Sequence, residues 1–366
     1  MSGTVSAIQQ WSCTGLLSAD ETSTECNPFA LIILNQPVTR PDILQRLWHT
    51  AGVKICADGG GNRVHDTFQS FRVAPEEETR DVRESFLPDI IKGDLDSLRP
   101  DVQSYYASKG VRIIKDGDEY STDLQKCIQH VEEMEQAYSA AGEKMWIPIV
   151  ILGGLSGRLD QTTSVLSLLH KLRKRTEQSS KNGSSMDSRG RQTSPPTSQT
   201  TLVSSTYSAI NASHDRSIPG SVTLPTGEEL YISYADDGES LEAAGRRVAR
   251  GVGKRDIKVI NDDCIAWALD SGTHEITIDH SLFGQTCGVL PLGVEESRVQ
   301  TAGLKWDFGK LNIRTRLSSS VAEVITALDW LTSFNTQIST SNHLLPENPS
   351  VTVTTTRPVF WTMEIR

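Results

Sequence analysis

The sequence lacks paired cysteines, a long apolar run and an excess of basic residues. Its 6 cysteines are scattered over 366 residues without a Cys-x-x-Cys pair, which argues against a disulfide framework or a zinc site. No window approaches the roughly 18 apolar residues of a membrane-spanning helix, and the N-terminus does not read as a secretory leader. The net charge of −10 makes nucleic acid an unexpected partner. We therefore expect a cytoplasmic protein with neither a membrane nor nucleic acid among its partners.

Two glycine motifs of nucleotide-binding proteins are also missing. The sequence contains neither a Gly-x-x-x-x-Gly-Lys-Ser/Thr loop nor a Gly-x-Gly-x-x-Gly fingerprint. The second absence argues against an oxidoreductase of the Rossmann type. Because the chain is acidic, an anionic ligand would need a metal ion or a few placed basic side chains.

Short apolar runs and helical patterns alternate in the first part of the chain. Runs that are apolar at consecutive positions are typical of strands covered on both faces. Helical patterns lie between them, including one after Thr122 with apolar residues at helical spacing. This alternation predicts a mostly parallel, Rossmann-like α/β sheet with helices on both faces. The five runs lie at 29–35, 53–60, 88–94, 111–116 and 146–154.

Composition divides the chain into four parts. Residues 1–27 form an N-terminal extension, and 28–175 form the α/β domain. Residues 176–255 are rich in serine and threonine and poor in large apolar side chains, so we expect a largely disordered insertion. Residues 256–366 hold short alternating runs that predict an antiparallel β-sandwich domain. Within that domain, 319–334 has helical spacing and predicts a helix.

A polar or glycine-rich loop follows each of the five predicted strands. In open parallel sheets, ligands bind at the carboxyl ends of the strands. We therefore expect the five loops to meet at one crevice although they are far apart in sequence. The loops are Asn35–Pro37, Asp58–Asn62, Gly93–Ser97, Asp116–Asp123 and Gly153–Gln161.

Aspartates dominate two of these loops. Asp94 and Asp96 are separated by one residue, and Mg²⁺ prefers one or two carboxylates together with phosphate oxygens. A solvated acidic turn, or a cap for the following helix, explains the same pair equally well. Asp123 lies in the first turn of a predicted helix, with Lys126 on the same side. The two suit a metal ligand and a phosphate contact, although a capping carboxylate is the commoner reason for such an aspartate.

Glycine dominates two other loops. In Asp58–Asn62 the absence of side chains lets backbone N–H groups approach a phosphate, although a flexible turn is the simpler explanation. Gly153–Gln161 adds Arg158 and Asp160. An arginine can stabilise charge on a transferred phosphoryl group, whereas an Arg–Asp pair on the surface contributes little.

Taken together, these loops predict a Mg²⁺-dependent enzyme that transfers a phosphoryl or diphosphoryl group from a nucleotide. Each signal is weak by itself, but four aspartate- or glycine-bearing loops at successive strand ends favour a shared site. The same reasoning leaves another nucleotide-using transferase open.

Seven segments in the same order resemble the eukaryotic thiamine pyrophosphokinase family. The resemblance covers roughly 28–175 and 256–366, and the long insertion is similar to that of fungal members. It implies a nucleotide-binding catalytic domain followed by a thiamine-binding β-sandwich. It also implies a homodimer, with active sites at the subunit interface, that transfers the diphosphate of Mg-ATP to the hydroxyethyl oxygen of thiamine. The segments are ADGGGNRVHD, PDIIKGDLDS, STDLQKC, LGGLSGRLDQ, GLKWDF, STSN and RPVFWTM.

The resemblance also implies roles for individual residues. The catalytic residues would be Asp94, Asp96, Asp123, Arg158 and Asp160, the first three of them as ligands of Mg²⁺. The ATP-binding residues would be Asp58, Gly59, Gly60, Asn62, Thr122, Lys126, Gly153 and Gly154. The thiamine-binding residues would be Trp306, Ser339 and Asn342, with Trp306 stacking on thiamine bound to the other subunit. Which aspartate accepts the proton of the thiamine hydroxyl is left open.

The sequence departs from the family pattern at two places. Glu119 follows Asp118 where family members often have glutamine, and an added segment at 311–331 lies between Trp306 and Ser339. A non-catalytic protein that binds thiamine or a nucleotide is a further alternative. Against it, the aspartates and basic residues of the motifs are all present.

Overall fold

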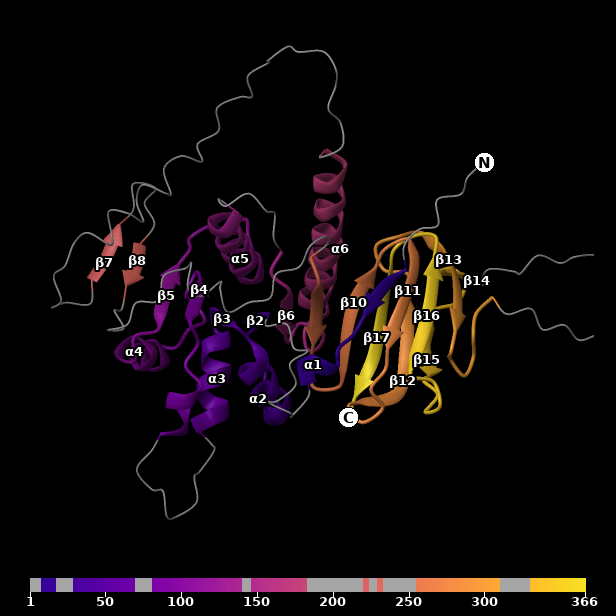
Figure 1. Cartoon of the computed structure of the whole chain (residues 1–366). Coiled ribbons are helices and arrows are strands. Elements are labelled where there is room, and N and C mark those ends of the chain that lie inside the picture. Colours follow the sequence, from indigo (N-terminus) through magenta and orange to yellow (C-terminus); the bar gives the residue numbers. More distant parts are fainter. Residues whose placement is uncertain are drawn as a thin grey trace, which may run out of the picture.

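Two β-sheets, of 12 and 5 strands among the described residues, organise the computed structural model (Figure 1). The predicted α/β class with a C-terminal antiparallel domain is confirmed. No helix among the residues placed by the structure is long and apolar enough to cross a membrane. The structure describes residues 8–17, 29–69, 81–139, 146–182, 220–223, 229–232, 255–309 and 330–366.

Five parallel strands form the part of the larger sheet that carries the predicted loops. Their order is β6-β2-β3-β4-β5, and each neighbouring pair is parallel. Every residue of β2, β4 and β6 is buried, as expected for strands covered on both faces. The strands are β2 (Ala30–Ile33), β3 (Val53–Ala57), β4 (Ile90–Gly93), β5 (Arg112–Lys115) and β6 (Ile149–Leu152).

Helices cover both faces of these strands. Apolar side chains of α2, α3 and α4 belong to one core with Leu31, Cys56 and Ile91, while those of α5 and α6 pack in a second core with Ile32 and Ile55. Alternate residues of each strand thus face opposite helical layers. The short 3-10 helix η2 (Val82–Ser85) precedes β4. The α-helices are α2 (Pro41–Thr50), α3 (Gly60–Gln69), α4 (Pro100–Ser108), α5 (Asp123–Ser139) and α6 (Leu159–Asn182).

The C-terminal domain shares the larger sheet. β9 pairs in parallel with β6, and an antiparallel series follows in the order β9-β10-β17-β12-β15. The sequence predicted two domains but gave no sign of this continuity, because strand pairing across domains leaves no local pattern. The strands are β9 (Ile257–Ile260), β10 (Cys264–Leu269), β12 (Phe283–Leu290), β15 (Ser339–His343) and β17 (Val359–Ile365).

The second sheet packs on this antiparallel series and completes the predicted β-sandwich. Side chains from both sheets, such as Trp267 and Trp361 on one side and Val299 and Val353 on the other, share one buried core. Figure 1 shows this sandwich beside the α/β layers, with α6 between them. The order is β1-β11-β16-β13-β14. The strands are β1 (Gln9–Trp11), β11 (Gly272–Thr277), β13 (Glu296–Ala302), β14 (Trp330–Ser333) and β16 (Ser350–Thr355).

The N-terminal extension contributes an edge strand to the sandwich. β1 pairs in parallel with β11, and the Trp11 ring lies 5.8 Å from that of Trp267. The Nζ of the buried Lys258 lies 5.6 Å from the Trp11 ring, and it pairs with Asp256. Helix α1 (Thr14–Leu17) follows and buries Leu17. Residues 8–17 therefore cover part of the junction between the two domains.

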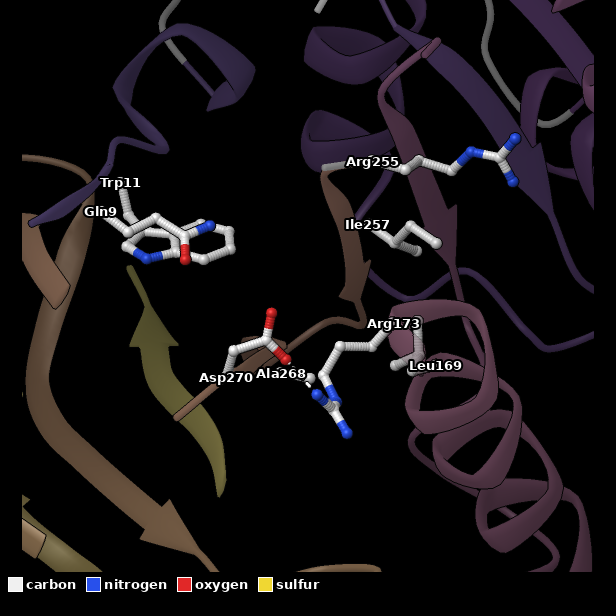
Figure 2. Close-up of a pocket in the computed structure, with 8 residues that line it drawn as sticks. All are labelled: Gln9, Trp11, Leu169, Arg173, Arg255, Ile257, Ala268 and Asp270. Carbon is white, nitrogen blue, oxygen red and sulfur yellow. Dashed lines mark hydrogen bonds and ion pairs between the residues drawn. The ribbon is translucent and has the colours of Figure 1, made fainter. Parts of the chain in front are cut away.

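A cavity of about 30 Å³ lies at the same junction. Figure 2 shows Gln9 and Trp11 on one side of it, and Arg173, which pairs with Asp270, on the other. Ile257, at the amino end of β9, also lines it. The cavity has room for only about two water molecules, and it lies away from the carboxyl ends of the parallel strands. It is therefore not the expected substrate site.

Two predicted segments fall mostly outside the described residues. Within the expected insertion at 176–255, α6 continues to Asn182, and β7 (Gly220–Thr223) pairs with β8 (Glu229–Ile232), which extends the sheet beyond β5. The helix predicted over 319–334 is wrong at Trp330–Ser333, because these residues form β14. They pair with β13, so cross-strand packing overrides the helical spacing of the sequence.

Candidate active site

Three carboxylates meet at the carboxyl ends of β3 and β4. Asp58 follows β3, Asp94 follows β4, and Asp123 is the first residue of α5. One oxygen from each lies within 4.8 Å of the others. The expected convergence of these loops is confirmed. Three hard oxygen ligands at one point suit a divalent cation such as Mg²⁺.

Asp58 also fixes the loop that carries Asp94. Its two carboxylate oxygens accept hydrogen bonds from the backbone N–H groups of Ser97 (3.0 Å) and Leu98 (3.1 Å). Burial is the main cause that raises the pKa of Asp58, and the neighbouring Asp123 and Asp94 raise it further. Its backbone has a φ of 43°, a conformation uncommon for non-glycine residues and often found at functional sites.

Gly93 permits the close approach of these carboxylates. A Cβ at this position would lie 2.6 Å from the Cβ of Asp58 and 3.0 Å from Oδ1 of Asp123. The backbone N–H of Asp94 donates to the same Oδ1 at 3.3 Å. Any larger residue at 93 would therefore push the cluster apart.

Helix α5 presents Asp123 together with Lys126. The Lys126 side chain is only 2% exposed, and its Nζ lies 3.3 Å from Oδ1 of Asp123. Burial and then the charge of Asp94 raise the pKa of Asp123, while Lys126 opposes that shift. Thr122 caps the helix: its hydroxyl accepts from the N–H of Gln125 at 3.3 Å, and its own N–H donates to Oε1 of Gln125 at 2.8 Å. This reciprocal capping box sets where the helix begins.

Asp96 is not part of the cluster of three. Its carboxylate accepts a hydrogen bond from the hydroxyl of Ser97 at 2.8 Å, and its N–H donates to Oδ1 of Asp94 at 3.1 Å. Both contacts are local to the turn, the arrangement that the acidic-turn alternative predicts. Asp96 and Asp94 are both exposed, so each is accessible to a ligand at the carboxyl edge of the sheet.

The glycines after β3 let two strand ends approach each other. A Cβ on Gly59 would lie 2.3 Å from Nδ2 of Asn35, and one on Gly60 would lie 2.2 Å from the carbonyl oxygen of Ile33. Asn62, in the first turn of α3, donates to the carbonyl of Ser97 at 2.7 Å. These predicted site residues thus hold the ends of β2, β3 and β4 together.

The loop after β6 lies at the same edge of the sheet. Gly153 and Gly154 have φ values of 93° and 95°, which favour glycine. The side chain of Gln36 holds this loop, because it accepts from the N–H of Gly154 at 2.8 Å and donates to the carbonyl of Ser156 at 2.6 Å.

Arg158 and Asp160 lie where this loop enters α6. They form an ion pair, and their side chains are 73% and 63% exposed. This geometry matches the alternative given for the two residues, an Arg–Asp pair on the surface. Its exposure leaves both groups accessible to a ligand.

The predicted thiamine-binding residues lie in the β-sandwich. Trp306 is 51% exposed and has the ring of His343 at 4.9 Å and the Nζ of Lys305 at 4.6 Å. Asn342 donates to the Trp306 carbonyl at 2.8 Å and accepts from its N–H at 3.3 Å. Asn342 and Ser339 are both buried on β15. Asn342 therefore holds the loop that presents the Trp306 ring.

The carboxylates and Trp306 lie in different parts of one chain. Trp306 follows β13, which belongs to the smaller sheet. Figure 1 shows β13 on the far side of the molecule from β3 and β4, with α6 and β10 between them. Within one chain the two groups therefore lie on different parts of the fold.

Sequence reasoning missed the roles of Asn35, Gln36 and Arg63 at the edge of the sheet. Arg63 donates from Nε to Oδ1 of Asn35 at 2.8 Å. The available signal was that Asn35 and Gln36 follow a buried strand within a loop already expected at the crevice. Their partners could not be predicted, because each contact joins residues distant in sequence.

A parallel sheet with carboxylates gathered at its carboxyl edge, joined to a β-sandwich, suits an enzyme of the transferase class that binds its ligand at the strand ends. More specifically, the chain belongs to the thiamin pyrophosphokinase family. The family model "Thiamin pyrophosphokinase, catalytic domain" matches residues 44–179. The model "Thiamin pyrophosphokinase, vitamin B1 binding domain" matches 273–360, and the two together cover more than half of the chain.

Individual relatives agree with this membership. Thiamine pyrophosphokinase 3 of Oryza sativa subsp. japonica is 27% identical over 340 residues, which cover 92% of this chain and 87% of the relative. The thiamine pyrophosphokinase of Saccharomyces cerevisiae is 32% identical over 188 residues, 42% of this chain and 54% of the relative. Among solved structures, thiamin pyrophosphokinase from Candida albicans has a similar fold, with a TM-score of 0.59 at 19% identity, covering 99% of this chain and 96% of that one.

Proposed function

We propose that the protein transfers the diphosphate of ATP to the hydroxyethyl oxygen of thiamine, releasing AMP and thiamine diphosphate. The observation that carries this proposal is the match of both family domains, in order, to a chain whose first domain gathers three carboxylates at one point. The C-terminal match, to a vitamin B1 binding domain, supports thiamine as the acceptor.

We further propose that Asp94 and Asp123 hold Mg²⁺, with Asp96 from the same loop as a third ligand. When bound, the ion neutralises the triphosphate and polarises the β-phosphorus. Asp58 keeps the loop in place through its two backbone hydrogen bonds. A carboxylate of this cluster accepts the proton of the thiamine hydroxyl, which is a weak nucleophile until that proton leaves.

Basic and glycine residues at the same edge would bind the nucleotide. Lys126 lies beside Asp123 and offers charge to a phosphate oxygen. Arg158, exposed at the start of α6, would stabilise charge on the transferred diphosphate, with Asp160 orienting its guanidinium. The loops at Asp58–Asn62 and Gly153–Gly154 let backbone N–H groups approach the phosphates.

We propose a homodimer whose active sites form between subunits. The separation of Trp306 from the carboxylates within one chain supports this arrangement, because thiamine stacked on Trp306 must reach ATP at the cluster. Trp306 would come from one subunit and the carboxylates from its partner. The partial exposure of Trp306 agrees with a ring kept free for a flat heteroaromatic ligand.

A cytoplasmic location is also proposed. The cysteines in the described ranges, Cys13, Cys56, Cys127, Cys264 and Cys287, are all free thiols. Free thiols are expected in a reducing compartment.

The proposed reaction is tested by AMP release from Mg-ATP with and without thiamine, together with the mass of the thiamine product. We expect thiamine-dependent AMP and a product heavier by one diphosphate. AMP or ADP release that ignores thiamine would point to another nucleotide-using transferase. Saturable thiamine binding without turnover would point to a binding protein.

A further inference from the structure

The basic side chains at the carboxyl edge of the sheet differ in whether they form an ion pair with a carboxylate. Lys126 pairs with Asp123, and Arg158 pairs with Asp160. Lys92, at the end of β4, lies 3.4 Å from Asp116 and has a side chain only 8% exposed. Three basic side chains at this edge are thus each matched by a negative charge.

Arg63 differs from these three, and it shares this with Lys115, which is exposed at the end of β5. Arg63 lies in the first turn of α3, directly after the glycine loop of β3, and is half-buried. Its Nε donates to the neutral side chain of Asn35 at 2.8 Å, and no described carboxylate forms an ion pair with it. Its charge therefore stays uncompensated beside the loops proposed to bind phosphates.

The position of the Asn35 side chain determines where the Arg63 guanidinium lies. Its amide lies so close to Gly59 that a Cβ there would be 2.3 Å from Nδ2. The neighbouring Gln36 is tied to the loop after β6 by hydrogen bonds to Gly154 and Ser156. The pair Asn35–Arg63 therefore lies between the glycine loop of β3 and that of β6.

We propose that Arg63 binds the polyphosphate chain of the nucleotide and that Asn35 positions its guanidinium. This inference rests on the proposed function and adds a phosphate-binding residue and a positioning residue to it. Guanidinium groups present several N–H donors in a fixed fork that matches phosphate oxygens. Because Asn35 takes only Nε, the two terminal nitrogens remain for phosphate oxygens.

The first test is Arg63→Gln, with Arg46→Gln as the matched control. Arg46 donates to the backbone carbonyl of Leu17 at 3.2 Å, and it too forms no ion pair with a described carboxylate, but it lies on α2 away from the site. The probe is Mg²⁺ with α,β-methylene ATP, whose bridge cannot be cleaved, titrated by calorimetry. We expect Arg63→Gln to weaken binding by about ten- to a hundredfold, as for a lost hydrogen bond to a charged group, while Arg46→Gln binds like wild type.

A structural role for Arg63 predicts a different result. Loss of fold would lower Tm and raise the KM values for ATP and thiamine together. Our inference predicts that Arg63→Gln raises only the KM for ATP and that Arg63→Lys, which keeps the charge, restores part of the affinity. Wild-type affinity in Arg63→Gln would overturn the inference. If wild type binds the analogue but releases no thiamine-dependent AMP, the proposed function fails while the role of Arg63 is still measured.

Asn35→Asp gives a second test that does not alter Arg63. The substitution is isosteric, but the new carboxylate neutralises the guanidinium. We expect Asn35→Asp to weaken binding of the analogue strongly when Arg63 is present. In the Arg63→Gln background it should weaken binding much less, because Asn35 and Arg63 act as a unit. Equal effects in both backgrounds would show that Asn35 does not act through Arg63 and would overturn its positioning role.

Discussion

Replacing Asp94 should change catalysis and stability in opposite directions. It is exposed and raises the pKa of Asp58 and Asp123 by its charge. Asp94→Asn keeps an oxygen that can accept from the Asp96 N–H but removes that charge. We expect kcat/KM to fall by about a hundredfold or more, while Tm without Mg²⁺ at neutral pH rises by about 2 °C. Steady-state kinetics and thermal unfolding check both. Wild-type activity in this variant would exclude Asp94 as a metal ligand.

The raised pKa values also predict how the stabilising effect of Asp94→Asn depends on pH. A carboxylate with a folded pKa above its unfolded value keeps its proton longer in the folded state, so its contribution to stability decreases as pH rises. For Asp58 and Asp123 the contribution to stability starts to fall as pH rises past the ordinary pKa of 3.8. It is fully lost once the pH is above their raised pKa values. The difference in Tm between Asp94→Asn and wild type should therefore be largest at neutral pH and shrink on acidification toward that value. A difference independent of pH would contradict the assigned repulsion.

Trp306 and Asn342 should affect the two substrates unequally. Trp306→Ala removes the exposed ring, and Asn342→Ala releases the backbone that presents it. We expect each to raise the KM for thiamine, by about tenfold for Trp306→Ala, with the KM for ATP nearly unchanged. Trp306→Phe, which keeps a stacking surface, is the control. Its KM for thiamine should lie between those of wild type and Trp306→Ala. Equal changes in both KM values would mean that Trp306 does not contact thiamine.

At this scale, the sequence allowed the convergence of side chains to be predicted, but not their individual contacts. Asp94 and Asp123 could be expected to converge, because loops at the carboxyl ends of parallel strands share one edge. That Asp58 holds the Ser97–Leu98 backbone, or that Arg63 meets Asn35, could not be predicted. Those contacts depend on the distances between loops, which no local pattern encodes.

Among the elements, α5 depends on its cap for the placement of the site. Thr122→Ala removes the hydroxyl that accepts from Gln125 and should cost about 1 kcal/mol of stability. Because Asp123 and Lys126 lie in this first turn, the KM for Mg-ATP should rise as well. Thr122→Ser preserves the cap and is the matched control. Chemical denaturation and kinetics measure both effects, and unchanged values for Thr122→Ala would contradict the capping role.

Strand β1 should stabilise the domain junction. Trp11→Ala removes the ring that packs on Trp267 and covers Lys258. We expect a loss of about 2 kcal/mol in the free energy of unfolding, measured in urea. Ile8, 54% exposed and just before β1, supplies the control Ile8→Ala, which should change little. A Trp11→Ala protein as stable as wild type would show that β1 is dispensable.

The elements that sequence patterns missed are the short ones. β1 spans Gln9–Trp11 only, too short for any period to show, and it pairs with a strand far along the chain. At Trp330–Ser333 the helical spacing was real, but pairing with β13 decided the conformation. The buried parallel strands could be predicted, because continuous apolar runs reflect burial on both faces.

For the whole molecule, an active site shared between subunits predicts complementation. Asp94→Asn and Trp306→Ala would damage opposite contributions to the same site. In a mixed dimer one site then carries both defects and the other carries none. Random mixing should recover about a quarter of the wild-type activity at low thiamine, because half of the dimers are mixed.

The mixed sample is prepared by co-refolding or co-expression and compared with each variant alone. Two wild-type preparations labelled with different tags serve as the control for subunit mixing. Mixed dimers without recovered activity would show that each chain builds its own site.

Domain order could be predicted from composition, whereas the joining of the domains could not. The boundary near residue 256 stays a prediction, based on the change to alternating runs. The register of β6 with β9, Ile149 beside Ile257, pairs residues on opposite sides of the 176–255 segment.

The pairing of β6 with β9 also bears on motion. The hydrogen-bonded ladder is continuous from the parallel strands into the sandwich, so we expect little hinge motion between the two parts of one chain. Substrate capture then cannot rely on closing one domain onto the other within a subunit. In the proposed dimer, the loops at the carboxyl edge of the sheet and the junction between subunits would then admit thiamine and release thiamine diphosphate. The amides of β6 and β9 should accordingly be among the slowest to exchange with deuterium.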